Sequence, residues 1–291
     1  MLYDDARAWE ASPSKRVMLF GMSGLGKTYL SNILRESGGW FHYSADYRIG
    51  TRYMGEHIVD NFKREAMRNP FLAELLRSDS IYIASNITFD NLSPLSTYLG
   101  KPGNPDKGGI PFAEYRRRQE LHREAEIAAL LDTPRFIDRA KDLYDYDNFV
   151  CDSGGSICEV VDPLNPDDPV LTALSTNLLP VWIRGSEAHI EQLVRRFDKA
   201  PKPIYFGDDF LCRLWDQYRA ETGAAEDKVD PDAFMRWGYR QALDHRLPRY
   251  RAMAENWGLT VDAEDVAKVR DAADFEALIA RALGSRADTP T

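Results

Sequence analysis

The feature that most constrains this sequence is a glycine-rich segment that fits G-x-x-x-x-G-K-[ST] at every fixed position: Gly21-Met22-Ser23-Gly24-Leu25-Gly26-Lys27-Thr28. An apolar run at 17–20 precedes it and suits a buried parallel strand. The following residues, 29–36, place their apolar side chains on one helical face until two glycines end the helix. Strand, loop and helix therefore occur in the order that a phosphate-binding loop requires.

Each fixed residue of this loop has a chemical role. Gly21, Gly24 and Gly26 permit backbone angles closed to other residues, so that successive N–H groups can point at phosphate oxygens. Lys27, expected in a solvated site, can reach the β- and γ-phosphates, and Thr28 can supply a hydroxyl to Mg²⁺. The alternative is a glycine-rich turn that only caps a helix, but the complete motif and both flanks favour phosphate. The segment therefore predicts binding of ATP or GTP with Mg²⁺.

Composition narrows the class of protein. The chain has 291 residues and a formal charge of −9, which argues against general attraction to nucleic acid or to an anionic membrane. Its three cysteines, Cys151, Cys158 and Cys212, form no CxxC pair, and this favours a reducing cytoplasmic setting. The N-terminus is too acidic for a signal peptide, and no apolar run approaches the ~18 residues of a membrane span. We therefore expect a cytoplasmic globular protein.

Two further apolar segments end in aspartate. The segment 40–46 is predicted to be a strand that ends at Asp46, and 149–152 is a strand that ends at Asp152. Ligands bind at the carboxyl ends of strands in open α/β sheets, so both carboxylates are candidates for the site. Asp152 fits the Walker B pattern, in which a carboxylate assists Mg²⁺, or else a plain strand with a polar turn. Asp46 either orients an acceptor hydroxyl or caps a helix.

Basic residues supply the remaining candidates. Arg195 and Arg196 either stabilise charge on a transferring phosphoryl group or complement a helix C-terminus. Arg48 and Arg52 either bind an anionic substrate or lie on a solvated helix face. His122 and Glu126, four residues apart, are expected on a solvated face rather than at a metal ion.

Strands and helices alternate along most of the chain, which predicts an α/β fold with a parallel sheet and helices on both faces. Further strands are expected at 80–84, 178–184 and 258–261, and a long helix at 111–131. We expect one domain over 1–291, with a mainly helical insertion at 80–145 that shapes a substrate pocket or binds a partner.

The order of these motifs resembles the P-loop kinases of the shikimate, gluconate and nucleoside monophosphate type, over most of residues 16–284. The resemblance implies a P-loop NTPase three-layer sandwich. Asp46 matches the aspartate that contacts the acceptor hydroxyl in shikimate kinases. Gly154 and Gly155 match the glycine-rich turn beneath the substrate, and 195–203 is similar to the lid.

Other positions depart from the shikimate pattern. The residues 61–65 lack the arginine that anchors shikimate, Lys202 replaces an arginine before proline, and the insertion has no counterpart in the smallest members. These differences argue against shikimate itself as the acceptor.

The sequence thus predicts an ATP-dependent kinase that phosphorylates a hydroxyl of a small molecule. Two alternatives remain open at this point. One is a regulatory ATPase or nucleotide switch that acts on a protein partner. The other is a nucleic-acid end kinase, against which the net acidity argues.

Overall fold

The computed structural model describes residues 2–287 and groups them into two compact units. The sheet unit combines the chain up to Ala45, the stretch Glu126–Ala200 and the chain from Tyr239 onward. The helical unit combines Asp46–Ala125 and Pro201–Gly238. These borders differ from those of the expected insertion at 80–145, and the description as one domain with an insertion stays a prediction.

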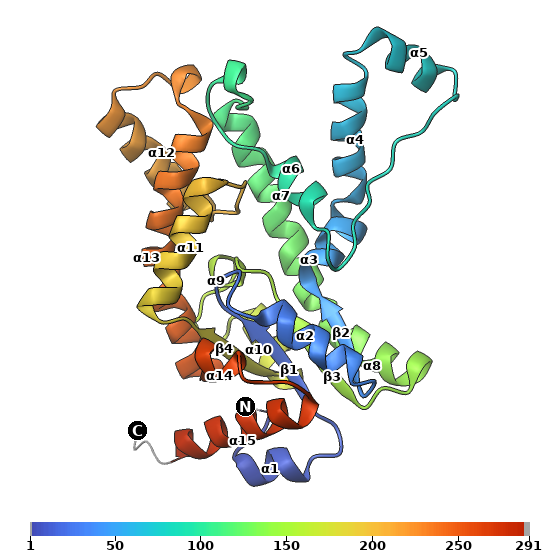
Figure 1. The fold of residues 1–291 in the computed structure, drawn as a ribbon, viewed down its shortest axis with the longest axis vertical. Helices are drawn as coiled ribbons and strands as arrows, with labels where there is room; N and C mark the ends of the chain where they lie inside the picture. Colours follow the sequence, from blue (N-terminus) through green and yellow to red (C-terminus); the bar gives the residue numbers. More distant parts are fainter. Residues whose placement is uncertain (1, 288–291) are drawn as a thin grey trace. The chain divides into compact units, whose positions relative to one another are not determined.

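A five-stranded parallel sheet forms the centre of the sheet unit (Figure 1). The strand order is β2-β3-β1-β4-β5, so the first strand of the chain lies in the middle. This confirms the predicted α/β class. The strands are β1 (Arg16–Phe20), β2 (Trp40–Ser44), β3 (Asn148–Asp152), β4 (Leu179–Arg184) and β5 (Leu259–Asp262).

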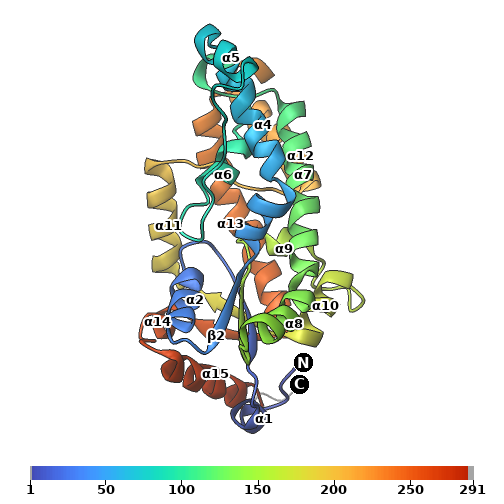
Figure 2. The ribbon, with the colours of Figure 1, turned by 90° about the vertical axis from the view of Figure 1, so that its right-hand side faces the viewer.

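The apolar runs became strands because both faces of this sheet are covered. Four of the five residues of β1 are buried, and β3 shows the same pattern, as expected for strands of a parallel sheet. Figure 2 shows α2 and α15 on one side of the sheet and α8 and α10 on the other. The sheet unit is therefore a three-layer α/β arrangement. Its helices are α1 (Ala6–Ala11), α2 (Lys27–Glu36), α8 (Thr133–Tyr144), α9 (Ile157–Val160), α10 (Pro169–Asn177), α11 (Glu187–Lys199), α14 (Ala263–Val266) and α15 (Ala272–Ala287).

The N-terminal helix α1 is capped and anchored by side chains. Asp5 accepts a hydrogen bond from the N–H of Ala8 at 2.8 Å, which satisfies one of the free donors of the first turn. Trp9 is fully buried and donates its indole N–H to the carbonyl of Glu276 on α15 at 3.0 Å. The start of the chain is thus attached to the last helix.

The helical unit holds the remaining helices. Three of them, α3, α7 and α13, cross the border between the units and contribute residues to both. None of the helices that the structure describes is long and apolar enough to cross a lipid bilayer. The helices are α3 (Ala45–Arg48), a π-helical turn (Ile49–Tyr53), α4 (Gly55–Ala66), α5 (Pro70–Arg77), α6 (Ser93–Leu99), α7 (Phe112–Leu131), α12 (Asp208–Thr222) and α13 (Pro231–Trp257), with short 3-10 turns at Pro105–Lys107 and Glu226–Lys228.

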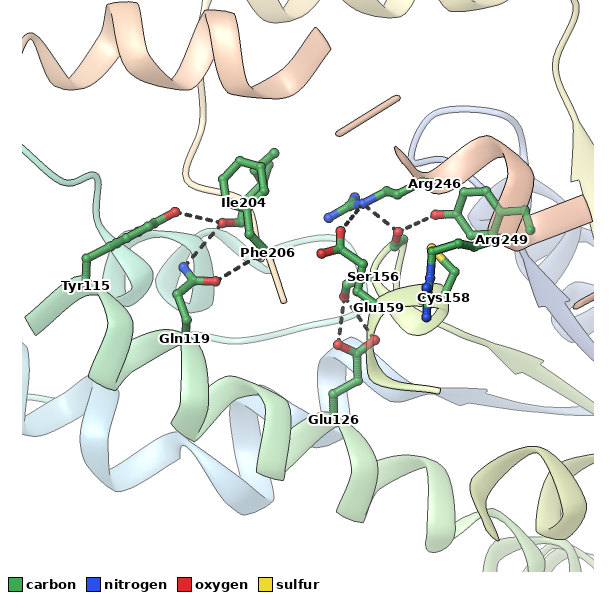
Figure 3. A network of polar contacts seen from close by, with 12 residues as sticks. Tyr115, Gln119, Glu126, Ser156, Cys158, Glu159, Ile204, Phe206, Arg246 and Arg249 are labelled. Atoms are coloured by element: carbon green, nitrogen blue, oxygen red, sulfur yellow. Dashed lines mark hydrogen bonds and ion pairs between the residues drawn. The ribbon is translucent and has the colours of Figure 1, made fainter. Parts of the chain in front are cut away.

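An aromatic cluster and an amide side chain organise the core of the helical unit. Trp215 stacks on Phe112 at 4.5 Å and meets Phe234 edge-on at 5.1 Å. On α7, Gln119 donates to the carbonyl of Ile204 at 3.3 Å and accepts from the N–H of Phe206 at 2.9 Å (Figure 3). This buried amide fixes the segment that leads into α12 because it satisfies a backbone donor and a backbone acceptor.

Two expectations about this part of the chain are wrong. The segment 80–84 is irregular, because its short apolar run pairs with no strand among the described residues, and Tyr82 remains 89% exposed. His122 and Glu126 do not lie on a solvated face, since both side chains are buried. The ring of His122 stacks on Tyr205 at 5.0 Å, and Glu126 accepts hydrogen bonds from Ser156.

Burial of His42 in β2 predicts a loss of stability in acid. Burial, and then the nearby charge of Arg35, lowers the pKa of His42 to about 4. Below the ordinary pKa of about 6.5 the unfolded chain takes up this proton and the folded chain does not. We therefore expect the free energy of unfolding to fall by up to about 3 kcal/mol as the pH drops from 7 toward 4.

Urea denaturation of the wild type and His42→Gln at pH 7.5 and pH 5 measures this effect. The variant should lose less stability between the two pH values than the wild type. His57→Gln, at an exposed position of α4, serves as the control and should behave as the wild type. Equal losses in all three proteins would contradict the assignment.

Candidate functional site

The glycine-rich loop joins β1 to α2 at the carboxyl edge of the sheet. Gly24 and Gly26 have φ values of 93° and 108°, in the left-handed region that favours glycine. Gly26 is also the N-cap of α2, and as a glycine it provides no side-chain cap for the N–H groups of the first turn. Those donors, together with the positive end of the helix dipole, can bind an anion.

The side chain of Lys27 folds back onto the loop that precedes it. Its ammonium donates to the carbonyl of Gly21 at 2.8 Å and to that of Met22 at 3.3 Å. The side chain is 6% exposed, so the expectation of a solvated lysine is wrong. The charge is instead held next to the loop backbone, where phosphate oxygens would replace carbonyl oxygens as its partners.

Thr28 and Asp152 form a direct pair beside the loop. The threonine hydroxyl donates to Oδ2 of Asp152 at 2.9 Å. Burial raises the pKa of Asp152, and the charge of Lys27 and the hydrogen bond from Thr28 oppose that rise. The pair offers a hydroxyl and a carboxylate oxygen, and Mg²⁺ prefers such oxygen ligands when substrate phosphates complete its shell. The side chains present therefore fit this ion.

The turn that follows Asp152 approaches the loop closely. Ser153 is tied to β1, because its N–H and its hydroxyl both donate to the carbonyl of Leu19, at 3.2 and 2.9 Å. A Cβ atom at Gly155 would lie 2.7 Å from Oγ of Ser23. A side chain at position 155 would therefore require the Ser23 hydroxyl to move. Gly154, the other glycine of the predicted turn, is buried.

The two adjacent arginines of α11 lie in different surroundings. A Cβ atom at Gly24 would lie 2.7 Å from Nη2 of Arg196, so this guanidinium contacts the glycine-rich loop. Arg195 is 77% exposed and pairs with Glu191 at 2.9 Å. Both arginines are exposed, but Arg196 contacts the loop whereas Arg195 pairs with Glu191.

Contacts with α13 hold α11 in this position. Phe197 stacks on Tyr239 with ring centroids 4.0 Å apart and planes 4° apart. Arg240 pairs with Asp198 at 2.5 Å. Both contacts are made by the two residues that follow Arg196, so they help to hold its backbone beside the loop.

The predicted substrate residues Asp46, Arg48 and Arg52 belong to the helical unit. Asp46 is half-buried in the first turn of α3, two residues after the end of β2. The guanidinium of Arg48 lies 5.6 Å from the ring centroid of Tyr53, and Arg52 is exposed. Their roles toward a substrate stay predictions.

Several contacts around the site were not anticipated from the sequence. The turn 153–156 is contacted from distant parts of the chain by Glu126, Arg246 and Tyr250, and Glu159, just after the turn, pairs with Arg246. These residues share a buried polar side chain, and the sequence does not reveal that burial.

Comparison with known proteins adds little to this geometry. No family model matches the sequence, and no curated protein matches it. Among solved structures, the chain is similar to shikimate kinase from Bacteroides thetaiotaomicron, at 15% sequence identity and a TM-score of 0.37. The match covers 92% of this chain and 95% of that chain. A similarity of this degree does not place the chain in a family.

The burial of Asp152 should lower the stability of the protein without metal, although its carboxylate is the group proposed to bind Mg²⁺. Because its pKa is raised on folding, the folded chain binds this proton more readily than the unfolded chain. Without a metal ion, stability should therefore fall as the pH rises through this pKa. Asp152→Asn should melt at or above the wild-type temperature at pH 7.5 in EDTA, yet gain less stability from MgCl2 with ADP.

Thermal melts at pH 5.5 and 7.5, with EDTA or with MgCl2 and ADP, check both effects. Asp167→Asn, at an exposed site in the same unit, is the matched control and should follow the wild type. An Asp152→Asn protein that is stabilised by MgCl2 and ADP as strongly as the wild type would remove Asp152 from the ion site.

Proposed function

We propose that this protein is an ATP-dependent kinase that transfers the γ-phosphoryl group to a hydroxyl of a small-molecule acceptor. One observation carries the proposal: the Thr28–Asp152 pair, joined at 2.9 Å, lies beside a glycine loop closed by Lys27. This arrangement supplies oxygen ligands for Mg²⁺, a cation for phosphate and a helix N-terminus, which are the parts that phosphoryl transfer uses.

Each residue has a distinct part in the proposed reaction. The loop N–H groups and Lys27 would hold the β- and γ-phosphates, and Mg²⁺ at Thr28 and Asp152 would neutralise their charge. The acceptor oxygen would form a bond to the γ-phosphorus while the bond to the β–γ bridging oxygen breaks. Asp46 would take the acceptor proton, and ADP would leave with the bridging oxygen.

Arg196 would stabilise the charge that spreads over the transferring group. Its guanidinium contacts Gly24 of the loop, and an arginine fork can engage several oxygens at once. Arg195, paired with Glu191, is less suited to this role. Arg48 and Arg52 would bind an anionic group of the acceptor, as their charge allows.

A nucleotide switch that acts on a protein partner is the second candidate. Its support is two exposed aromatic side chains of the helical unit, Phe71 at 67% and Tyr82 at 89%. Such a protein would need the nucleotide site but not Asp46. Nothing among the described residues favours a nucleic-acid end as the acceptor.

Lys27→Met tests the nucleotide site itself. The substitution keeps the length of the side chain and removes the ammonium, so we expect ATP affinity to fall by roughly 10- to 100-fold. Isothermal titration of ATP with MgCl2 measures the affinity, and circular dichroism confirms the fold. Lys199→Met, at an exposed site of α11, should bind as the wild type does. Unchanged affinity in Lys27→Met would remove the basis of the proposal.

Asp46→Asn separates a kinase from a switch. In a kinase, nucleotide affinity should remain, whereas acceptor-stimulated ATP consumption should slow by roughly 10²- to 10⁴-fold through loss of a general base. The assay measures ADP release with and without a panel of hydroxylated metabolites and nucleosides. If no acceptor stimulates turnover, and basal hydrolysis is the same in both proteins, the nucleotide switch becomes the better description.

A further inference from the structure

A single carbonyl next to the nucleotide site receives two buried donors. Nη1 of Arg246 donates to the carbonyl of Gly155 at 3.2 Å, and the hydroxyl of Tyr250 donates to the same oxygen. Both donors come from α13, one helical turn apart, and both side chains are buried. The two lone pairs of this carbonyl are thus used by groups that the tertiary structure brings from far along the chain.

A second charge holds Arg246 in place. Its Nε donates to Oε1 of Glu159 on α9, and the two side chains are 6% and 1% exposed (Figure 3). A buried ion pair recovers little net stability over an apolar pair of the same volume, because both charges lose water. The pair instead fixes the orientation of the Arg246 guanidinium, because this group is planar and its donors have fixed angles.

The other side of the same turn is held by a buried carboxylate. The hydroxyl of Ser156 lies 2.9 and 2.7 Å from the two oxygens of Glu126, whose side chain is fully buried (Figure 3). Ser153, at the start of the turn, is bonded to Leu19 of β1. The turn 153–156 is therefore fixed by side-chain hydrogen bonds at three of its four residues.

The position of this turn matters for the proposed site. It begins immediately after Asp152, and Gly155 lies so close to Ser23 that a Cβ atom there would displace the Ser23 hydroxyl. A small shift of the turn would move the carboxylate relative to Thr28, and sites that hold charged ligands depend on such placement.

We propose that Arg246 and Tyr250 are positioning residues, with Glu159 directing Arg246. They hold the carbonyl of Gly155 and so set the turn 153–156 against the glycine-rich loop, which tunes the affinity for a Mg²⁺–nucleotide complex. This inference rests on the proposed function. It assigns no contact between Arg246 and the nucleotide.

Tyr250→Phe is the first test, because it removes one donor and keeps the ring. We expect the affinity for ADP with MgCl2, measured by isothermal titration, to fall by about 3- to 10-fold. The Mg²⁺ concentration needed for half-maximal binding should rise with it. Amide hydrogen exchange of the segment 153–156, measured without any ligand, should become faster than in the wild type.

A paired substitution tests the ion pair. Arg246→Met combined with Glu159→Gln removes both charges together, so that neither is left buried alone. This protein should show the same shifts as Tyr250→Phe and a larger loss of affinity. Its thermal melt without ligand shows whether the fold is retained, and Tyr250→Phe decides the question if it is not.

Arg249→Gln is the matched control. Arg249 lies on the same helix and donates to the carbonyls of Cys158 and Val161, but not to Gly155. Its substitution should leave ADP affinity and exchange of 153–156 unchanged. An equal loss of affinity in this control would mean that general loosening of the region is responsible, and the inference would be wrong.

The two proposals fail in different ways. Wild-type protein that binds neither ATP nor ADP with MgCl2 would overturn the proposed function, and this inference with it. Wild-type binding that stays the same in Tyr250→Phe, with unchanged Mg²⁺ dependence and exchange, would overturn this inference alone.

Discussion

The parallel pairing of β1 with β3 is the constraint on which the site depends. In this register Leu19 lies opposite Asp152, so the strand that leads into the glycine-rich loop ends beside the strand that ends in the carboxylate. The hydroxyl of Thr28, at the start of α2, then reaches Asp152 without any rearrangement of the loop. If β3 slipped by one residue, Asp152 would turn to the opposite face of the sheet.

Several buried charged side chains surround the Thr28–Asp152 pair. Lys27 and Asp152 lie at the loop, and the Arg246–Glu159 pair and Glu126 lie around the following turn. Burying charges costs free energy unless partners are close, and each of these groups has hydrogen bonds. A protein selected only for stability would replace such groups by apolar ones. Their concentration at one edge of the sheet therefore agrees with a site built to hold a charged ligand.

On α11, the position of a residue around the helix axis decides which arginine contacts the loop. Arg195 and Arg196 are adjacent in sequence, but successive residues of an α-helix point about 100° apart. The stacking of Phe197 on Tyr239 helps to fix the helix in the orientation that brings Arg196 to the loop. Arg196 consequently contacts Gly24, and Arg195 pairs with Glu191 in solvent.

The sequence by itself determined the features whose causes are local. The glycine loop follows from backbone angles that only glycine adopts readily, and its flanking strand and helix follow from the spacing of apolar residues. The α/β class and the place of Asp152 at a strand end were predictable for the same reason. Strand order was not, because it depends on pairing between segments far apart in the chain.

Only the tertiary structure decided the rest. The segment 80–84 has a strand-like composition, but a strand also needs a partner, and among the described residues this segment has none. His122 and Glu126 have polar side chains, yet packing buries both. Arg246 lies 91 residues from Gly155 along the chain, and no local sequence pattern predicts a hydrogen bond between residues so far apart. Such contacts exist because folding brings distant groups together and then requires that every buried charge find a partner.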